Sequence, residues 1–139
     1  MPSPLRLSAT GIDLSPRVFR STTVAASPAL AAETVVCTLT LTADVQVQSG
    51  VILLAFGAFT MGTDGTTYNL KVRQTGTSGT VLAASGVCAL AAAALGSESI
   101  VTFDASPTLP NQVYVLTATM ANASAESEFS AASLVAIIV

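Results

Sequence analysis

The amino-acid sequence predicts an all-β fold, namely an antiparallel β-sandwich of the jelly-roll type behind an extended N-terminal arm. Apolar and polar residues alternate strictly over most of residues 33–50. Turn-forming residues then recur roughly every 8–15 residues, which predicts about seven or eight strands. No stretch keeps a helical period over enough residues to indicate a long helix.

The arm is predicted over residues 1–32. Prolines interrupt it at positions 2, 4, 16 and 28, and only residues 17–24 ("RVFRSTTV") have the pattern of a short strand. The arm has three arginines and one aspartate, whereas the remainder of the chain is acidic. Such an arm either docks on an acidic protein surface or is simply a solvated tail. We divide the chain into this arm and a sandwich domain over residues 33–139.

The sandwich domain opens with the segment "ETVVCTLTLTADVQVQSG", in which threonines alternate with apolar residues. This period of two predicts a strand with one buried face and one solvent-exposed face. The buried face is expected to comprise Val35, Cys37, Leu39, Leu41, Ala43, Val45 and Val47.

The next segment, residues 51–61 ("VILLAFGAFTM"), is apolar on both faces, which is typical of a strand covered on each side. Only one face of a sheet meets the core of a single sandwich, so we expect a second subunit to cover the other face. Candidates for burial between subunits are Val51, Leu53, Ala55, Ile137 and Val139.

Further strands are predicted at "TYNLKVRQT", with Tyr68, Leu70 and Val72 inward, and at "VYVLTATMA", with Tyr114, Leu116, Ala118 and Met120 on one face. Residues 76–79 ("GTSG") and 106–112 ("SPTLPNQ") are expected to be a turn and a loop. Residues 86–99 are ambiguous between a short helix and a strand of small residues. The end of the chain, residues 133–139 ("SLVAIIV"), has no charge, and a jelly roll explains this because its last strand is paired on both sides.

The composition excludes several functions. Charged residues make up 9% of the chain, against roughly 25% in ordinary soluble domains, so hydroxyl groups or neighbouring subunits must cover the surface. Histidine and tryptophan are absent and the net charge is −3. The chain therefore lacks the commonest general base and metal ligand, and it has no electrostatic footprint for nucleic acid.

The carboxylates share no catalytic or metal-binding motif, and we expect them to be solvated: Asp44, Asp64, Asp104, Glu126 and Glu128. No serine lies in a nucleophile motif. We therefore expect no enzyme activity, no catalytic residue, no metal and no cofactor.

No export signal is visible at the N-terminus, and the longest apolar run is too short to span a bilayer. We expect no membrane partner and synthesis in a host cytoplasm, where Cys37 and Cys88 are expected to be buried thiols. A disulfide between them is the less favoured alternative.

From residue 34 onward, the predicted segments follow in a particular order. A strand with alternating threonines comes first and an apolar strand second. They are followed by the polar hairpin "TYNLKVRQTGTSGTVL", the segment "YVLTATMANASAES" and an apolar last strand. This order resembles small virion proteins of tailed bacteriophages, whose jelly-roll sandwiches are similar to trimeric tumour-necrosis-factor-type heads. The resemblance implies a capsid decoration (cement) protein or a fibre knob, and it carries over no functional residue.

Two functional hypotheses result. The first is a trimeric decoration protein on the capsid surface of a virion, bound to the major capsid protein, with the arm residues Arg6, Arg17, Phe19 and Arg20 as candidate shell contacts. The second is a receptor-binding or adhesive knob of a phage fibre, against which the short arm and few aromatics argue. Another minor virion or tail component has the same pattern.

Overall fold

The structure of the chain is a computed structural model. It describes residues 6–8, 11–13, 18–23, 27–28, 32–42, 47, 49–60, 66–91, 94–121 and 128–139. Throughout this part of the chain the regular elements are strands, so the predicted all-β class is confirmed. Within the same residues there is no helix that is long and apolar enough to cross a membrane.

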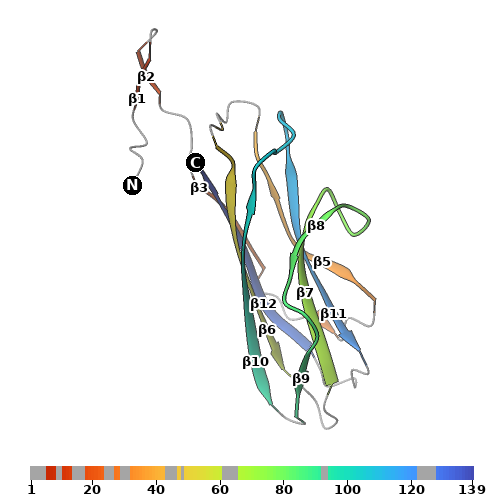
Figure 1. Cartoon of the computed structure of the whole chain (residues 1–139). Helices are drawn as coiled ribbons and strands as arrows, with labels where there is room; N and C mark the ends of the chain where they lie inside the picture. Colours follow the sequence, from red (N-terminus) through yellow and green to blue (C-terminus); the bar gives the residue numbers. More distant parts are fainter. Residues whose placement is uncertain are drawn as a thin grey trace.

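Two antiparallel sheets face each other as the layers of a sandwich (Figure 1). In the first sheet the order is β10-β6-β12-β3, and β4 also pairs with β12. Its strands are β3 (Val18–Thr23), β4 (Ser27–Pro28), β6 (Val51–Thr60), β10 (Leu95–Asp104) and β12 (Glu128–Ile138).

The second sheet has the order β5-β11-β7-β8, and β9 also pairs with β7. Its strands are β5 (Thr34–Thr40), β7 (Thr66–Gln74), β8 (Val81–Ala84), β9 (Cys88–Leu90) and β11 (Val113–Ala121). A separate hairpin pairs β1 (Arg6–Ser8) with β2 (Gly11–Asp13).

The pairing pattern is that of a jelly roll. Among the main strands β3 pairs with β12, β5 with β11, β6 with β10, and β7 with β8 and β9, so the first pairs with the last and successive pairs nest inside. The additional pairs β6–β12 and β7–β11 join these hairpins into the two sheets, and every pair is antiparallel. This is a long hairpin rolled upon itself, as the sequence predicts.

The apolar end of the chain lies inside the first sheet. Strand β12 is hydrogen-bonded to β6 on one side and to β3 on the other. Beyond β12, the N–H of Val139 donates to the carbonyl of Gly50 at 3.0 Å, and its own carbonyl accepts from the N–H of Ser49 at 2.7 Å. Backbone pairing on both sides satisfies the polar groups that an apolar terminus would otherwise bury.

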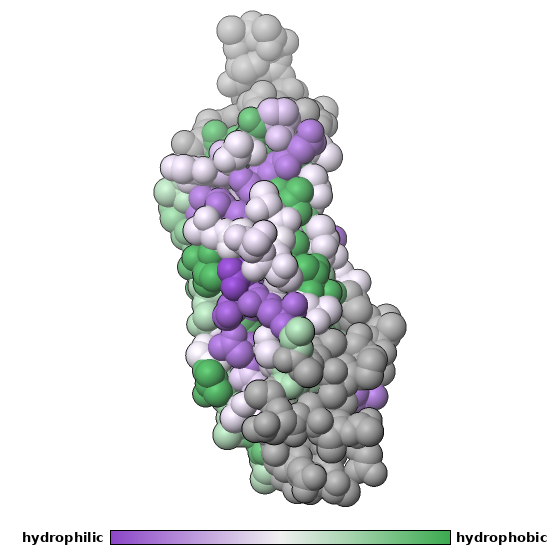
Figure 2. Space-filling model, turned by 90° about the vertical axis from the view of Figure 1, so that its right-hand side faces the viewer, coloured by the Kyte–Doolittle hydropathy of each residue, from purple (hydrophilic) through white to green (hydrophobic). Residues whose placement is uncertain are grey.

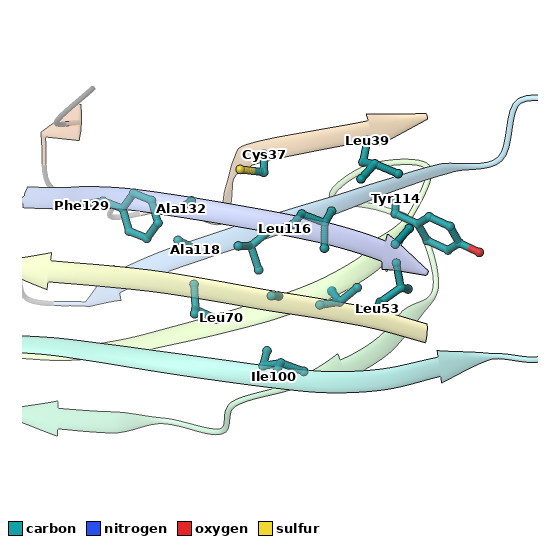
Figure 3. Close-up of a cluster of buried hydrophobic side chains, with 14 of the residues drawn as sticks. Cys37, Leu39, Leu53, Leu70, Ile100, Tyr114, Leu116, Ala118, Phe129 and Ala132 are labelled. Carbon is teal, nitrogen blue, oxygen red and sulfur yellow. The ribbon is translucent and has the colours of Figure 1, made fainter. Parts of the chain in front are cut away.

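The core fills the space between the sheets (Figure 3). Its aromatic part is a cluster in which the Phe59 ring lies 4.1 Å from Tyr68 and 5.1 Å from Phe129, measured between centroids. The inward faces predicted for β7 and β11 are confirmed: Tyr68, Leu70, Val72, Tyr114, Leu116, Ala118 and Met120 are all buried.

Strand β5 follows the predicted alternation except at its start. Cys37, Leu39 and Leu41 are buried as expected, but Val35 is 38% exposed. The pairing with β11 shifts at this point, since Leu116 opposes Cys37 and Thr117 opposes Val35, which leaves Val36 as an extra residue. Such a β-bulge turns Val35 outward. Ala43 and Val45 lie outside the described residues.

The predicted turn and loop are both present, at residues 75–79 and 105–112. In the ambiguous segment, residues 88–90 and 95–99 belong to strands β9 and β10, so the strand alternative is correct there.

The arm boundary predicted at residue 33 is too late. Strand β3 confirms the short strand expected within residues 17–24, but it pairs with β12 over six residues and is therefore part of the sandwich. Its side chain Phe19 packs against the core. The alternation in β3 was too short to show from sequence that its partner would be the last strand.

Candidate interaction surface

The described residues contain no cluster of three or more side chains that could hold a metal ion. Of the carboxylates expected to be solvated, Asp104 is instead buried, and Glu128 is half-buried on β12. Asp44, Asp64 and Glu126 lie outside the described residues.

Asp104 connects the two sheets at one end of the sandwich. Its Oδ2 accepts hydrogen bonds from the Tyr114 hydroxyl and from Gln74 Nε2, both at 2.8 Å, and its Oδ1 accepts from the Ser106 N–H at 3.0 Å. Burial, followed by the neighbouring Asp104, raises the pKa of Tyr114 well above its usual range. The phenol therefore remains a hydrogen-bond donor, and the cluster is structural because all of its groups are mutually satisfied.

A groove of about 380 Å³ with a mixed polar and apolar lining lies beside this cluster, between the residue 75–80 turn and the residue 108–113 loop. Amide and hydroxyl groups line it, including the buried side chain of Gln112. Gln112 already accepts from the Thr108 N–H at 2.7 Å and donates to the Val113 carbonyl at 2.8 Å. The groove thus offers a ligand neither a charged group nor an unsatisfied Gln112 amide.

The outer face of the second sheet is mixed: hydrophilic patches run down the middle of that side of the molecule, with hydrophobic patches beside them (Figure 2). Glu33 bonds there to Arg73, with Nε–Oε1 at 2.6 Å and Nη2–Oε2 at 3.0 Å, and to Lys71 Nζ at 3.2 Å. Thr117 Oγ1 donates to Glu33 Oε1 at 2.7 Å. The pKa of Glu33 is lowered to about 2, and the hydrogen bond from Arg73 is the largest cause. These partners cover β11 on its outer side.

The outer face of the first sheet is different, because apolar side chains continue across all four strands. The strand register places them in rows. The first row is Phe103, Ile52, Ile137 and Val18, and the second row is Val101, Leu54, Val135 and Arg20. Phe56 lies between two serines in the third row.

We call the eight apolar members of these rows the apolar face: Val18, Ile52, Leu54, Phe56, Val101, Phe103, Val135 and Ile137. Leu54 and Phe56 at its centre are 37% and 38% exposed. Strands about 4.8 Å apart and rows about 6.8 Å apart give the face an extent on the order of 400 Å² once side chains are included. The largest apolar patch of a typical monomer has a similar area and is often functional, so the apolar face is the candidate interaction surface.

The residues predicted to be buried between subunits fall on two faces. Val51, Leu53 and Ala55 point into the core of their own chain, so selecting them from β6 was wrong. Ile137 lies on the apolar face, and Val139 is half-buried beyond the end of β12. The outward members of β6 are Ile52, Leu54 and Phe56. Since both sides of β6 are apolar, the sequence pattern could not distinguish its inner from its outer face.

The predicted shell contacts are also divided. Phe19 is partly buried and packs against the core, whereas Arg20 is exposed at the edge of the apolar face. Arg6 belongs to β1, and Arg17 lies outside the described residues. The sequence did not single out Val101 and Phe103, although their alternation with Ile100 and Thr102 was a usable signal.

In the part of the chain that the structure describes, Cys37 and Cys88 form no disulfide with each other. Cys37 is buried, as expected, whereas Cys88 is only half-buried and donates to Glu98 Oε2 at 3.4 Å. Burial and then this carboxylate raise the pKa of Cys88, which keeps it a thiol rather than a reactive thiolate.

No known protein-family model matches the sequence, and no curated protein matches it either. Solved structures do share its fold. A chain of the T13 particle of infectious bursal disease virus has a TM-score of 0.62 at 12% identity, covering 99% of this chain and 36% of that one. For the Gx strain of the virus the TM-score is 0.57 at 14% identity, with 99% and 38% covered. The chain thus spans little more than a third of these proteins, and at this identity the likeness shows a common sandwich fold.

Proposed function

We propose that this chain is a structural protein of a virus particle, and more specifically a decoration protein that binds the major capsid protein on the outside of a phage capsid. The observation that carries the proposal is the apolar face, which covers four strands of a jelly roll and has a single arginine at its edge. A surface of this kind is suited to binding protein, and it has only Arg20 and two serines with which to orient a small substrate.

Two further findings support this proposal. A portion of a virus-particle protein has a similar fold in a match that covers 99% of this chain. Within the described residues, the carboxylate networks of Glu33 and Asp104 bond strands together and leave no reactive group over the groove. The chemistry of the molecule is that of assembly, so we propose no catalytic role and no cofactor.

We propose a homotrimer as the assembled form, with the apolar face buried against a neighbouring copy. Removing apolar surface from water contributes roughly 25 cal/mol per Å², so a face on the order of 400 Å² supplies about 10 kcal/mol before the entropy of association is subtracted. We propose Arg20, at the edge of this contact, and the arm residues Arg6 and Arg17 as the contacts with the shell.

The proposed mechanism of shell stabilisation is thermodynamic linkage between binding and capsid assembly. A protein that binds the assembled shell more tightly than separate capsomers shifts the equilibrium toward the shell by that difference in binding free energy. Many symmetric copies multiply the effect through their effective concentration.

The first test is the mass of the purified chain by light scattering, with Leu54→Asp as the variant and Thr38→Asp as its matched control. Thr38 is exposed on β5 in the other sheet. We expect a mass of three chains, or a multiple of three, for the native chain and for Thr38→Asp. For Leu54→Asp we expect a smaller mass that is not a multiple of three, with an unchanged circular dichroism spectrum. A native monomer would contradict the trimer.

The second test is binding to undecorated phage capsids and to host cells. Saturable binding to capsids, weakened in a variant lacking residues 1–17, supports the decoration role. The deletion ends before β3 so that the sandwich stays intact. Binding to cells without binding to capsids would instead support the fibre-knob alternative.

A further inference from the structure

Strand β10 forms one edge of the first sheet. It pairs with β6 in an unbroken register over ten residues, from Leu95 with Thr60 to Asp104 with Val51. On its other side no strand of the described part of the chain pairs with it. A long regular edge of this kind exposes a row of backbone N–H and C=O groups that another strand can bind.

The other three sheet edges have features that discourage such pairing. β3 and β4 are short, and β4 contains Pro28. β8 and β9 are separated by Gly86, which has φ +79°, and the β7–β8 register shifts beside Arg73. β5 has its bulge at Val36. β10 has no proline, bulge, lysine or arginine.

The same edge collects exposed apolar side chains. Of the nine large apolar side chains that are exposed in the described part, five belong to residues 81–103, and three of them are on β10. Leu95 is 79% exposed, Val101 70% and Phe103 50%. A strand that pairs with β10 would place cross-strand neighbours beside all three.

The charged and polar inward side chains of β10 do not project along this edge. Glu98 accepts a hydrogen bond from Cys88, which belongs to the opposite sheet. Thr102 Oγ1 reaches the carbonyl of Leu82 in β8 at 3.4 Å, also between the sheets. The outward residues between the apolar ones are Ser97 and Ser99, which are neutral.

We propose that the β10 edge pairs antiparallel with β10 of a second copy of this chain across a two-fold axis. In the register centred on Ser99, that residue faces its own copy, Ser97 faces Val101, and Leu95 faces Phe103, so each exposed apolar side chain gains a cross-strand neighbour. Glu98 then lies opposite Ile100 and not opposite another Glu98, which avoids like-charge repulsion.

This contact goes beyond the proposed function and does not depend on it. A two-fold contact is self-complementary, whereas a trimer needs a different, three-fold contact. The axis is perpendicular to the sheet, so the apolar faces of both copies point to the same side. Combined with a trimer, the edge contact would link trimers into a network, as a cement layer requires.

The test is disulfide formation in the full chain with Cys88→Ser as background, comparing Ser99→Cys with Ser97→Cys. Directly opposed residues in an antiparallel pair have Cα atoms about 4.5–5.5 Å apart, within the range for a disulfide. In the proposed register two copies of residue 97 are about 14 Å apart. We expect Ser99→Cys to form dimers at least about tenfold faster than Ser97→Cys under mild oxidation.

Equal rates, or faster cross-linking at residue 97, would overturn the proposal. A second comparison uses Ser99→Lys, which places two ammonium groups opposite each other, against Thr38→Lys on the other sheet. We expect loss of the two-fold contact in sedimentation only for Ser99→Lys. If capsid binding fails while the residue 99 cross-link forms, the decoration role is wrong and the edge contact stands.

Discussion

Glu33 and Asp104 are carboxylates whose partners come from distant parts of the sequence. Glu33 bonds to β7 and β11 on the outer side of the second sheet, whereas Asp104 at the end of β10 bonds to the same two strands from within. Strands β7 and β11 are thereby held from both sides by ionic hydrogen bonds, which are stronger than neutral ones.

At the scale of the residue, we expect Glu33→Gln to lower the free energy of unfolding at pH 7 by about 1–2 kcal/mol, as charged hydrogen bonds at a partly exposed site are lost. The pKa of Glu33 is lowered to about 2 from 4.5, so its contribution is complete above about pH 4.5 and is lost as the pH falls toward 2. Urea unfolding of the native chain and of Glu33→Gln at pH 7 and pH 3 measures this contribution of Glu33 to the free energy of unfolding.

The control for that measurement is Glu128→Gln, which removes a carboxylate from the first sheet. At pH 7, Glu128→Gln should lower the free energy of unfolding by less than Glu33→Gln does. If the difference between the native chain and Glu33→Gln is the same at both pH values, the ion pair does not contribute as described.

At the scale of the element, the turn between β7 and β8 requires glycine at residue 79 but not at residue 76. A Cβ at Gly79 would lie against the carbonyl oxygen of Gln74, whereas a Cβ at Gly76 would meet nothing within 4 Å. The turn is further fixed by the Gln74 N–H, which donates to the Thr80 carbonyl at 3.0 Å. The close approach at Gly79 leaves no room for a side chain.

We therefore expect Gly79→Ala to lower the free energy of unfolding by about 1–3 kcal/mol and Gly76→Ala to change it by less than about 0.5 kcal/mol. Urea denaturation of the two variants, followed by circular dichroism, tests this directly. Equal effects of the two substitutions would show that the turn relaxes around a Cβ at residue 79.

The elements differ in how far the sequence predicts them. Leu70 and Val72 alternate with charged residues, so one face of β7 must be buried and the prediction succeeds. In β6, Leu53 and Leu54 are equally apolar, and only the packing of the two sheets shows that Leu53 points inward and Leu54 outward. Burial of Asp104 could not be foreseen because its partners Gln74 and Tyr114 are brought to it by the roll of the chain.

The size and position of the interaction surface also depend on the fold. Ile137 was a candidate from sequence, but Val18 and Phe103 join it in one row only because β3 and β10 lie in the same sheet as β12. An apolar face assembled from four distant segments has no local sequence motif. This is why the class of fold was predictable and the residues of the surface mostly were not.

At the scale of the whole molecule, association through the apolar face should be insensitive to salt. The face has only Arg20 at its edge, and the Debye length falls from about 10 Å at 0.1 M salt to about 3 Å at 1 M. We expect the mass measured by light scattering to be unchanged between 0.1 and 1 M sodium chloride. Dissociation at high salt would show that charged residues hold the subunits together.

The position of β12 determines when the sandwich can form. This strand follows all the others in the chain, yet it lies between β3 and β6 in the first sheet. While the chain is being synthesised, β3 must wait for a partner more than a hundred residues away, and the contacts that close the roll are among those most distant in sequence. Folding is therefore expected to be slow for a chain of this length, and the apolar strands made earlier stay exposed to aggregation until β12 arrives.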